Sequence, residues 1–271
     1  MTEPDYDKPP VVETVLGVQF EPLGPMRDAH LGAFWKSLGN EWKNISYAPA
    51  LPPQLESFAN APNWGIMAIQ FQLTQDVTNR LQIRNEAADR MIQIQNGRLH
   101  VNWLGHDGVE YPRYQNVRGQ FDSILDQFQV FVRQEGLGEL RPIQWEVIYI
   151  NRIPKDTVWS SPADWNFFRP IRDDTSLSLV QLESFGGEWH YEIPEHRGRL
   201  HVNFQHVRKP DPSAMESVVL TLTARGGIGG DQNVTSLDEG LNLGHETIVI
   251  SFKELMSDYA NQWWGLKDVN R

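Results

Sequence analysis

Residues 80–104 constrain the fold of this chain more than any other stretch. Polar and apolar residues alternate along it with a period of two, the period of a strand buried on one face. Asn96-Gly97 interrupts the alternation, and this dipeptide is a strong signal for a two-residue β-hairpin turn. The pattern predicts an antiparallel meander, and its strands are expected at 66–73, 80–85, 91–95 and 98–104.

Helical periodicity replaces this alternation directly after the meander. Apolar residues from Phe121 to Val132 are spaced to share one face of a helix over 115–134. Similar stripes predict helices over 26–42 and 247–264 and a short helix over 162–171, with a loop over 44–53. Further strands are expected at 11–20, 143–153, 177–184, 188–193, 200–207 and 218–225. Antiparallel strands interspersed with helices predict the α+β fold class.

Part of the first half of the sequence recurs in the second half. Residues 97–103 are GRLHVNW and residues 198–204 are GRLHVNF, so six of seven positions are identical. The helical pattern at 121–128 recurs at 252–259, and both opening strands follow a proline, at 10 and 142. The offsets are 101, 131 and 132 residues, so one period does not explain all three. Either the second half carries an insertion after the motif, or the two motifs are not structurally equivalent.

A duplication would divide the chain into a flexible tail (1–10), a first α+β repeat (11–140) and a second α+β repeat (141–271). Each repeat is expected to be a mainly antiparallel sheet with helices packed on one face. Two such repeats can form one continuous curved sheet with pseudo-two-fold symmetry, as in TATA-binding-protein-like or helix-grip folds. The opposite face of the sheet would then be free or would line a groove, although a fold alone does not assign a function.

Charge and composition restrict the partners that this chain can bind. The sequence has 24 Lys and Arg against 35 Asp and Glu, a formal charge of −11, which repels phosphate backbones and disfavours nucleic acid. It has no cysteine, which excludes disulfides, thiolate catalysis and Cys-based metal sites. The first ten residues do not resemble a signal peptide, and no apolar run approaches the roughly 20 residues of a membrane helix. We therefore expect a cytoplasmic protein without membrane association.

Residues 9–20, PPVVETVLGVQF, resemble the N-terminal signature of a sporadically distributed, uncharacterised bacterial family. Asn102-Trp103, Tyr111-Pro112 and residues 149–153 resemble later landmarks of the same family, so the resemblance covers much of the first 154 residues. The family has no established activity to transfer. Its patchy distribution implies horizontal spread, which is common among accessory, toxin–antitoxin and phage-defence genes.

Histidines are the first candidates for chemistry. His100 and His201 occupy the same place in the repeated motif, so in a duplicated sheet they would be symmetry mates that could ligate one metal ion. The alternative is that both are ordinary exposed or hydrogen-bonded strand residues, and we assign no metal. The run Gly226–Gly230 lacks the Lys-Ser or Lys-Thr of a P-loop, and no Gly-x-Ser-x-Gly occurs. The sequence therefore indicates no cofactor and no catalytic residue, and it favours a protein that is not an enzyme.

The candidate binding residues come from two segments. Residues 106–114 mix polar and aromatic side chains at the junction of the meander and the helix, where loops often carry function. The structural alternative for this segment is a capped turn in which an aromatic ring packs on Trp103. Residues 149–152 end the strand that joins the two halves, where they either line a groove or satisfy backbone groups. The expected binding residues are Trp103, His106, Tyr111, Arg113, Tyr149, Asn151 and Arg152.

Three functional hypotheses are compatible with these features. The first is a non-enzymatic protein-binding module, either a homodimer or part of a toxin–antitoxin or phage-defence type system. Its motivation is the absence of a catalytic motif, the acidic charge and the abundance of aromatic residues, which include Trp159, Trp165, Phe167 and Phe168. The second is a sensor that binds a small ligand or nucleotide in the groove between the halves. The third is a metal-dependent hydrolase or nuclease that uses the strand histidines.

Overall fold

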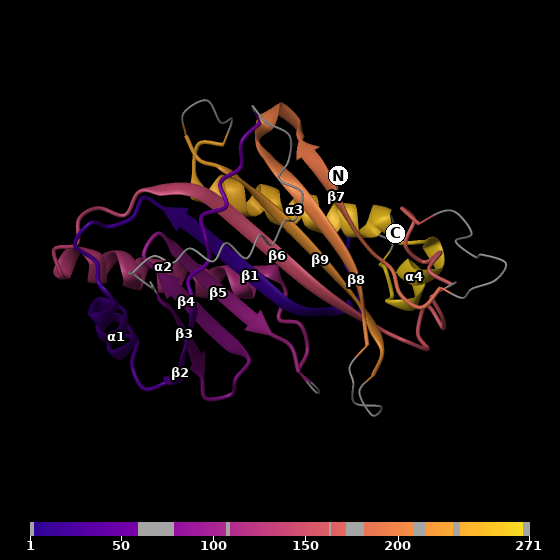
Figure 1. The fold of residues 1–271 in the computed structure, drawn as a ribbon, viewed down its shortest axis with the longest axis horizontal. Coiled ribbons are helices and arrows are strands. Elements are labelled where there is room, and N and C mark those ends of the chain that lie inside the picture. Colours follow the sequence, from indigo (N-terminus) through magenta and orange to yellow (C-terminus); the bar gives the residue numbers. More distant parts are fainter. Residues whose placement is uncertain are drawn as a thin grey trace.

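The protein is an α+β structure built on one large antiparallel sheet (Figure 1). The computed structural model describes residues 3–58, 79–106, 109–162, 164–171, 182–208, 215–229 and 234–267. The strands are β1 (Val11–Phe20), β2 (Trp42–Pro49), β3 (Asn79–Asn85), β4 (Arg90–Gln95), β5 (Arg98–Leu104), β6 (Pro142–Pro154), β7 (Gly186–Ile193), β8 (Gly198–Val207) and β9 (Ser217–Gly227). The helices are α1 (Asp28–Ser37), α2 (Tyr114–Gln134), α3 (Leu237–Leu255) and α4 (Asp258–Trp263), with a 3₁₀ turn at Pro194–His196.

The nine described strands form a single sheet in the order β2-β3-β4-β5-β1-β6-β9-β8-β7. Strands β1 and β6 pair in the middle, so the sheet runs without interruption across the boundary expected near residue 140. The meander is confirmed at β3, β4 and β5, which pair in sequence. Gly97 has φ +93° in the β4–β5 turn, a conformation that favours glycine and explains the Asn-Gly signal.

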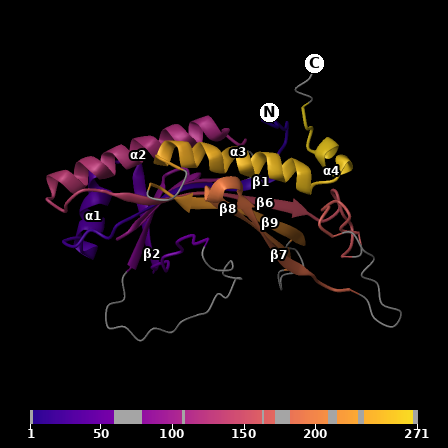
Figure 2. The same cartoon turned by 90° about the horizontal axis from the view of Figure 1, so that it is seen from above.

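The long helices α2 and α3 lie side by side on one face of the sheet (Figure 2). Helix α2 packs on β1 and β5, and α3 packs on β6 and β9. Alternate residues of β1 face this layer, so Leu16, Val18 and Phe20 are almost fully buried and the ring of Phe20 packs against that of Phe128. Burial of each such side chain contributes about 1.5–3 kcal/mol. Among the described helices, none combines the length and the apolar character that a bilayer crossing requires.

The closing helix differs from its prediction at both ends. It begins at Leu237 rather than 247, because the Ser236 hydroxyl accepts a hydrogen bond from the Glu239 amide and caps it. It stops before Met256, whose backbone is extended and bridges to Phe168, and α4 follows as a separate helix. The predicted helix over 247–264 is therefore two helices whose first starts ten residues earlier.

Three other local predictions also differ from the structure. The helix expected over 26–42 ends at Ser37, because Gly39 has φ +86° and the chain turns into β2. Residues 44–49 are strand and not loop. The short helix expected over 162–171 is not found among the described residues there. The strand expected at 66–73 lies outside the described residues, as does most of the one expected at 177–184.

The two copies of the repeated motif occupy different places in the sheet. Residues 98–103 of the first copy fall on β5, which pairs with the middle strand β1, whereas residues 198–204 fall on β8, which β9 separates from β6. The two motifs are therefore not in equivalent positions, which is the second of the two explanations left open by the offsets. The offset between the two motifs, 101 residues, therefore need not equal the offset between the helices, 131 residues.

Residues 5–8, within the segment expected to be a flexible tail, make contacts with the C-terminal residues 264–267. The amides of Asp7 and Lys8 donate to the carbonyls of Gly265 and Trp264 at 3.0 and 3.1 Å. Tyr6 is buried, and its hydroxyl donates to the Asn261 side chain at 2.6 Å. This segment thereby closes one end of the helix layer next to the middle strands.

Candidate functional site

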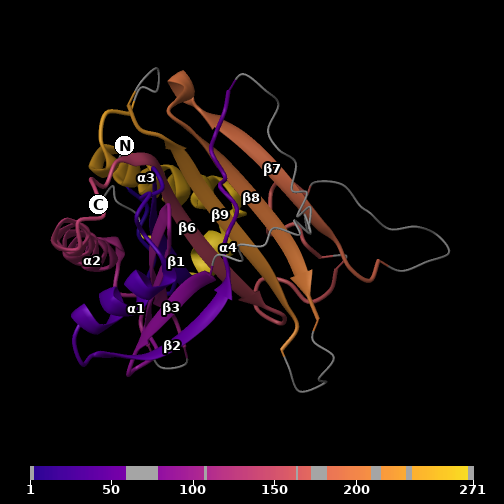
Figure 3. The ribbon, with the colours of Figure 1, turned by 60° about the vertical axis from the view of Figure 1, so that its left-hand side comes forward.

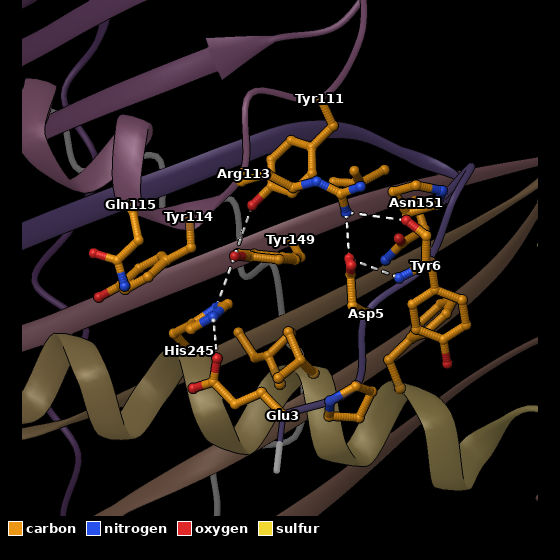
Figure 4. A pocket seen from close by; sticks show the side chains of 16 residues that line it. Glu3, Asp5, Tyr6, Tyr111, Arg113, Tyr114, Gln115, Tyr149, Asn151 and His245 are labelled. Atoms are coloured by element: carbon orange, nitrogen blue, oxygen red, sulfur yellow. Dashed lines mark hydrogen bonds and ion pairs between the residues drawn. The ribbon is translucent and has the colours of Figure 1, made fainter. Parts of the chain in front are cut away.

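A cavity of about 240 Å³ lies on the helix side of the sheet, where the middle strands β1 and β6 meet (Figure 4). We call it the Tyr149 cavity. The start of α2, the middle of α3 and the N-terminal segment enclose it. Its lining residues are Glu3, Pro4, Asp5, Tyr6, Pro9, Val11, Tyr111, Arg113, Tyr114, Gln115, Tyr149, Asn151, His245, Ile248, Val249 and Phe252.

All seven residues expected to bind a ligand line either the Tyr149 cavity or an open hollow that shares part of its wall. Four of them line the Tyr149 cavity: Tyr111, Arg113, Tyr149 and Asn151. The adjoining hollow is lined by Trp103, His106 and Arg152 and again by Tyr111 and Arg113. Two segments about 40 residues apart in the sequence are thus brought to one place by the pairing of β1 with β6.

Local structure explains how these side chains are aimed. Tyr149 and Asn151 are two residues apart on β6, so both point to the helix side. Arg113 precedes α2 with φ +71°, an uncommon conformation for a residue other than glycine that is often found at functional sites. Tyr111 packs edge-on against Trp103 at 5.1 Å between ring centroids, the contact expected for a structural turn.

A chain of hydrogen bonds runs along the inner wall of the cavity. The hydroxyls of Tyr111 and Tyr149 are 2.9 Å apart, and the Tyr149 hydroxyl is 2.8 Å from Nδ1 of His245 (Figure 4). Nε2 of His245 faces the carboxylate of Glu3 at 3.5 Å. The imidazole also stacks on the ring of Tyr114, with centroids 3.8 Å apart and planes 4° apart. The histidine is therefore held on both its ring face and its ring nitrogens.

Burial keeps the tyrosine hydroxyls and the imidazole of this hydrogen-bond chain uncharged at neutral pH. Loss of solvation lowers the pKa of His245 to about 4, because burial penalises the imidazolium. The same effect raises the pKa of Tyr114 to about 12 and the pKa of Tyr149 well above its usual value. Each hydroxyl can donate one hydrogen bond and accept another, so the hydrogen-bond chain can present either a donor or an acceptor to a ligand. With a pKa near 4, the imidazole is a weak base, which suits binding better than proton abstraction.

The charged groups at the mouth of the cavity are already paired. Arg113 donates to the carboxylate of Asp5 at 2.7 Å and to the carbonyl of Tyr6 at 3.0 Å. Lys267 also donates to Asp5 at 2.7 Å. The N-terminal segment thus supplies the carboxylates that neutralise the cations on this side of the cavity.

Sequence reasoning missed the histidine of this site. His245 lies before residue 247, where the helix was expected to begin, so it was not placed on a helix facing the sheet. The pattern Ser236-x-x-Glu239 is the sequence form of a capping box and would have indicated the earlier start. No local pattern indicates the pairing of His245 with Tyr149, because 96 residues separate them.

The two histidines considered as metal ligands are far apart. His100 lies on β5 and His201 on β8, four strand spacings away, which is about 19 Å at roughly 4.8 Å per spacing. They cannot ligate one ion. Nε2 of His100 lies 2.8 Å from a Glu146 oxygen, and Nε2 of His201 lies 2.7 Å from a Glu56 oxygen. Within the described ranges, no group of three or more potential ligands could hold a metal ion.

No family model, no curated protein and no solved structure matches this chain. Fold and site together define an α+β protein with helices on one face of a nine-stranded antiparallel sheet and a small cavity above its middle strands. The resemblance to the sporadically distributed bacterial family rests on the motif at residues 9–20 and stays a prediction.

The buried histidine makes a prediction about stability and pH. Between pH 6.5 and about 4 the unfolded chain binds a proton at residue 245 and the folded chain does not, so acidification favours unfolding. Its neighbours are Tyr149 on β6, Tyr114 on α2, Glu3 and, on its own helix, Glu246. We expect this residue to account for a loss of roughly 3 kcal/mol in the free energy of unfolding across that range.

Urea unfolding of wild type and His245→Gln at pH 7, 6, 5 and 4.5 measures this contribution. The variant should show a distinctly smaller loss of stability on acidification. Glu56 and Glu146 do not interfere, because their pKa values of about 2 place their effects below pH 4.5. Equal slopes for the two proteins between pH 6.5 and 4.5 would contradict the assignment.

Proposed function

We propose that this protein binds a small uncharged ligand in the Tyr149 cavity and acts as a binding protein or sensor rather than an enzyme. The observation that carries the proposal is the neutral hydrogen-bond chain in a cavity with mainly apolar walls. Ligand sites commonly combine such walls with a few polar groups that fix orientation. Tyr111, Tyr149 and Asn151 supply those groups here.

Size and charge narrow the class of ligand. A volume of about 240 Å³ is below the roughly 300–1,000 Å³ typical of sites for drug-sized ligands. Glu3 lines the same cavity and its carboxylate would repel a phosphate, while the cation Arg113 in the lining is already paired with Asp5. These features favour a small neutral molecule with one polar end over a nucleotide.

The position of the cavity fits the proposal of two related halves with pseudo-two-fold symmetry. Strands β5, β4 and β3 lie outward from β1, and β9, β8 and β7 lie outward from β6 in the same order along the chain. One long helix follows each set and packs on the same face. We propose that the sheet is a duplicated, curved one of TATA-binding-protein-like or helix-grip-like form. Superposition of residues 79–134 on 186–255 tests this.

A protein-binding function is the second candidate. Its support is the polar face of the sheet, which holds an extended segment of the chain. The aromatic residues considered as anchors give it none, because Trp159, Trp165, Phe167 and Phe168 are all buried in the core. Membership of a toxin–antitoxin or phage-defence type system stays a prediction, and pull-down of a partner from the native host is its test.

Thermal-shift screening of small neutral molecules tests ligand binding. A ligand at 100 times its Kd stabilises the native state by about 2.7 kcal/mol and raises Tm accordingly. Val249→Trp should remove the rise, because Val249 lines the cavity and an indole there would fill it. The matched control is Val130→Trp, on the exposed side of α2 and outside the cavity, which should respond like wild type. A Tm rise that persists in Val249→Trp would place the ligand elsewhere and contradict the proposal.

A further inference from the structure

The sheet face opposite α2 and α3 holds residues 51–58 of its own chain in an extended path. This segment follows β2 and crosses β4, β5, β1, β6, β9 and β8 in their order in the sheet, and Figure 3 shows it in purple across the later strands. Its outer side is open, and Leu55 is 56% exposed. The contacts show how this face of the sheet holds an extended backbone.

Two glutamines of the sheet hold the backbone of the segment with paired bonds. Oε1 of Gln95 accepts from the Leu51 amide and Nε2 donates to the carbonyl of the same residue, both at 2.8 Å. Oε1 of Gln144 accepts from the Glu56 amide at 2.8 Å, and its Nε2 donates to the Gln54 carbonyl at 2.7 Å. Each side-chain amide thus acts as a neighbouring strand would, by satisfying a backbone donor and a backbone acceptor.

Two further buried side chains extend this contact along the backbone. Gln19 on β1 makes a longer pair of bonds, of 3.4 Å each, with the amide and carbonyl of Gln54. Arg98 on β5 donates to the Pro52 carbonyl at 3.3 Å. Backbone atoms are common to all residues except for the missing proline N–H, so these contacts recognise an extended chain of many sequences.

Selectivity comes from one position in the segment. The carboxylate of Glu56 is 4% exposed and pairs with Arg199, Arg225 and His201. Burial alone would raise the pKa of Glu56, but hydrogen bonds from His201 and Arg225 hold it at about 2. Two residues on, Phe58 lies under the guanidinium of Arg199 at 4.8 Å from the ring centroid.

We propose that this face is a groove for an extended peptide of a partner protein that carries a glutamate at the place of Glu56, and that residues 51–58 occupy the groove in the free protein. The groove matches an acidic peptide because Arg98, Arg199 and Arg225 face it. An incoming peptide reproduces the contacts of the segment and displaces it.

Displacement of the segment leaves the core intact. The segment is held by hydrogen bonds, one cluster of charges and the packing of the Phe58 ring on Arg199, whereas the apolar core lies on the other side of the sheet, beneath α2 and α3. Pro52, Pro53 and Leu55 are exposed, so little buried apolar contact is lost when the segment leaves the sheet. A partner peptide that reproduces these contacts replaces those of the segment one for one.

Fluorescence anisotropy with a labelled peptide of residues 50–58, ALPPQLESF, tests the proposal on the full-length protein. In the protein variant Glu56→Gln, residues 51–58 of the chain bind the sheet more weakly and the groove itself is unchanged. The peptide should bind this host at least tenfold more tightly than it binds wild type. The same peptide with glutamine in place of its glutamate should bind the variant at least tenfold more weakly.

The host control is Glu86→Gln, which removes an exposed glutamate paired with Lys43 outside the groove and should bind like wild type. A folded Glu56→Gln host that does not bind the peptide overturns the proposal, as does equal binding of the two peptides. Light scattering measures the oligomeric state and so tests whether a second copy of the chain occupies the groove instead. A wild-type dimer that Glu56→Gln dissociates would identify a second copy of the chain in the groove and overturn the partner peptide.

Hydrogen exchange of the wild-type protein keeps the test independent of whether Glu56→Gln folds. The amides of Leu51 and Glu56 are bonded to sheet glutamines and should be protected in the free protein. Excess unlabelled peptide should accelerate their exchange at least tenfold and leave the amides of β1 and β6 unchanged. Protection of these two amides that saturating peptide does not alter would overturn the proposal.

Discussion

Replacement of Glu146 by leucine is expected to lower the free energy of unfolding by about 3–5 kcal/mol, the range for breaking a buried ion pair from one side. The Glu146 side chain is 3% exposed on β6, 2.8 Å from Nε2 of His100 and 3.7 Å from Arg225. Burial would raise the pKa of this carboxyl, but the hydrogen bond and charge of His100 hold it at about 2. Leucine would leave the buried His100 imidazole without its hydrogen-bond partner and would remove one of the two carboxylates beside Arg225, the other being that of Glu56.

The geometry of this pair depends on a glycine in the strand between its members. His100 is on β5 and Glu146 on β6, and the imidazole reaches across Gly17 of β1. A Cβ at position 17 would lie 2.5 Å from Cδ2 of His100. Only glycine at this position leaves room for the ring.

Urea denaturation of Glu146→Leu at pH 7 measures the effect. Glu86→Leu is the matched control, because Glu86 is exposed and an exposed ion pair contributes only about 0–1 kcal/mol. The double variant His100→Leu with Glu146→Leu should recover part of the loss, since it removes one of the unpaired groups as well. If Glu146→Leu unfolds at the same urea concentration as wild type, the Glu146 carboxylate does not stabilise the folded sheet.

Trp145→Ala should also destabilise the protein by about 3–5 kcal/mol, the usual range for emptying a buried tryptophan site. The indole is fully buried on β6 and lies directly beneath Gly240 and Gly244 of α3. Its Nε1 has no hydrogen-bond partner among the described residues, so the loss comes from packing. Chemical denaturation of the variant is the measurement.

A second substitution checks that this contact is the cause. A Cβ at position 240 would lie 2.2 Å from Cδ1 of Trp145, so Gly240→Ala should destabilise wild type by about 1–3 kcal/mol. In the Trp145→Ala background the clash is gone, and alanine should instead stabilise α3 by up to about 1 kcal/mol. Gly119→Ala in α2 is the control, because no atom lies within 4 Å of its added Cβ. An unchanged sign of the Gly240→Ala effect in the two backgrounds would exclude this explanation.

Local sequence patterns predicted the elements whose residues contact their sequence neighbours. The meander β3–β5 and helix α2 match their expected ranges closely, since alternation and the Asn-Gly turn are local features. The start of α3 was misplaced because Gly240 and Gly244 suggest a loop when Trp145 is not considered. Both positions are glycine within the helix because the indole occupies the space that a larger side chain would need.

The candidate site was predicted in part. Both segments, 103–113 and 149–152, were expected to supply binding residues, and the structure places both along one cavity and its adjoining hollow. His245 and Glu3 were not expected there. Their positions depend on α3 docking across β6 and on the N-terminal segment lying against residues 264–267, contacts between parts of the chain that no local pattern connects.

The sequence by itself determined the α+β class, the hairpin turn at Asn96-Gly97 and the alternation of polar and apolar side chains along the strands. Only the tertiary structure decided the strand order, the pairing of β1 with β6 and the segment that covers the polar face. The reason is physical. The alternation of polar and apolar residues indicates which side chains share a face of a strand. The element that packs on that face is selected by packing and hydrogen bonds between residues distant in the chain.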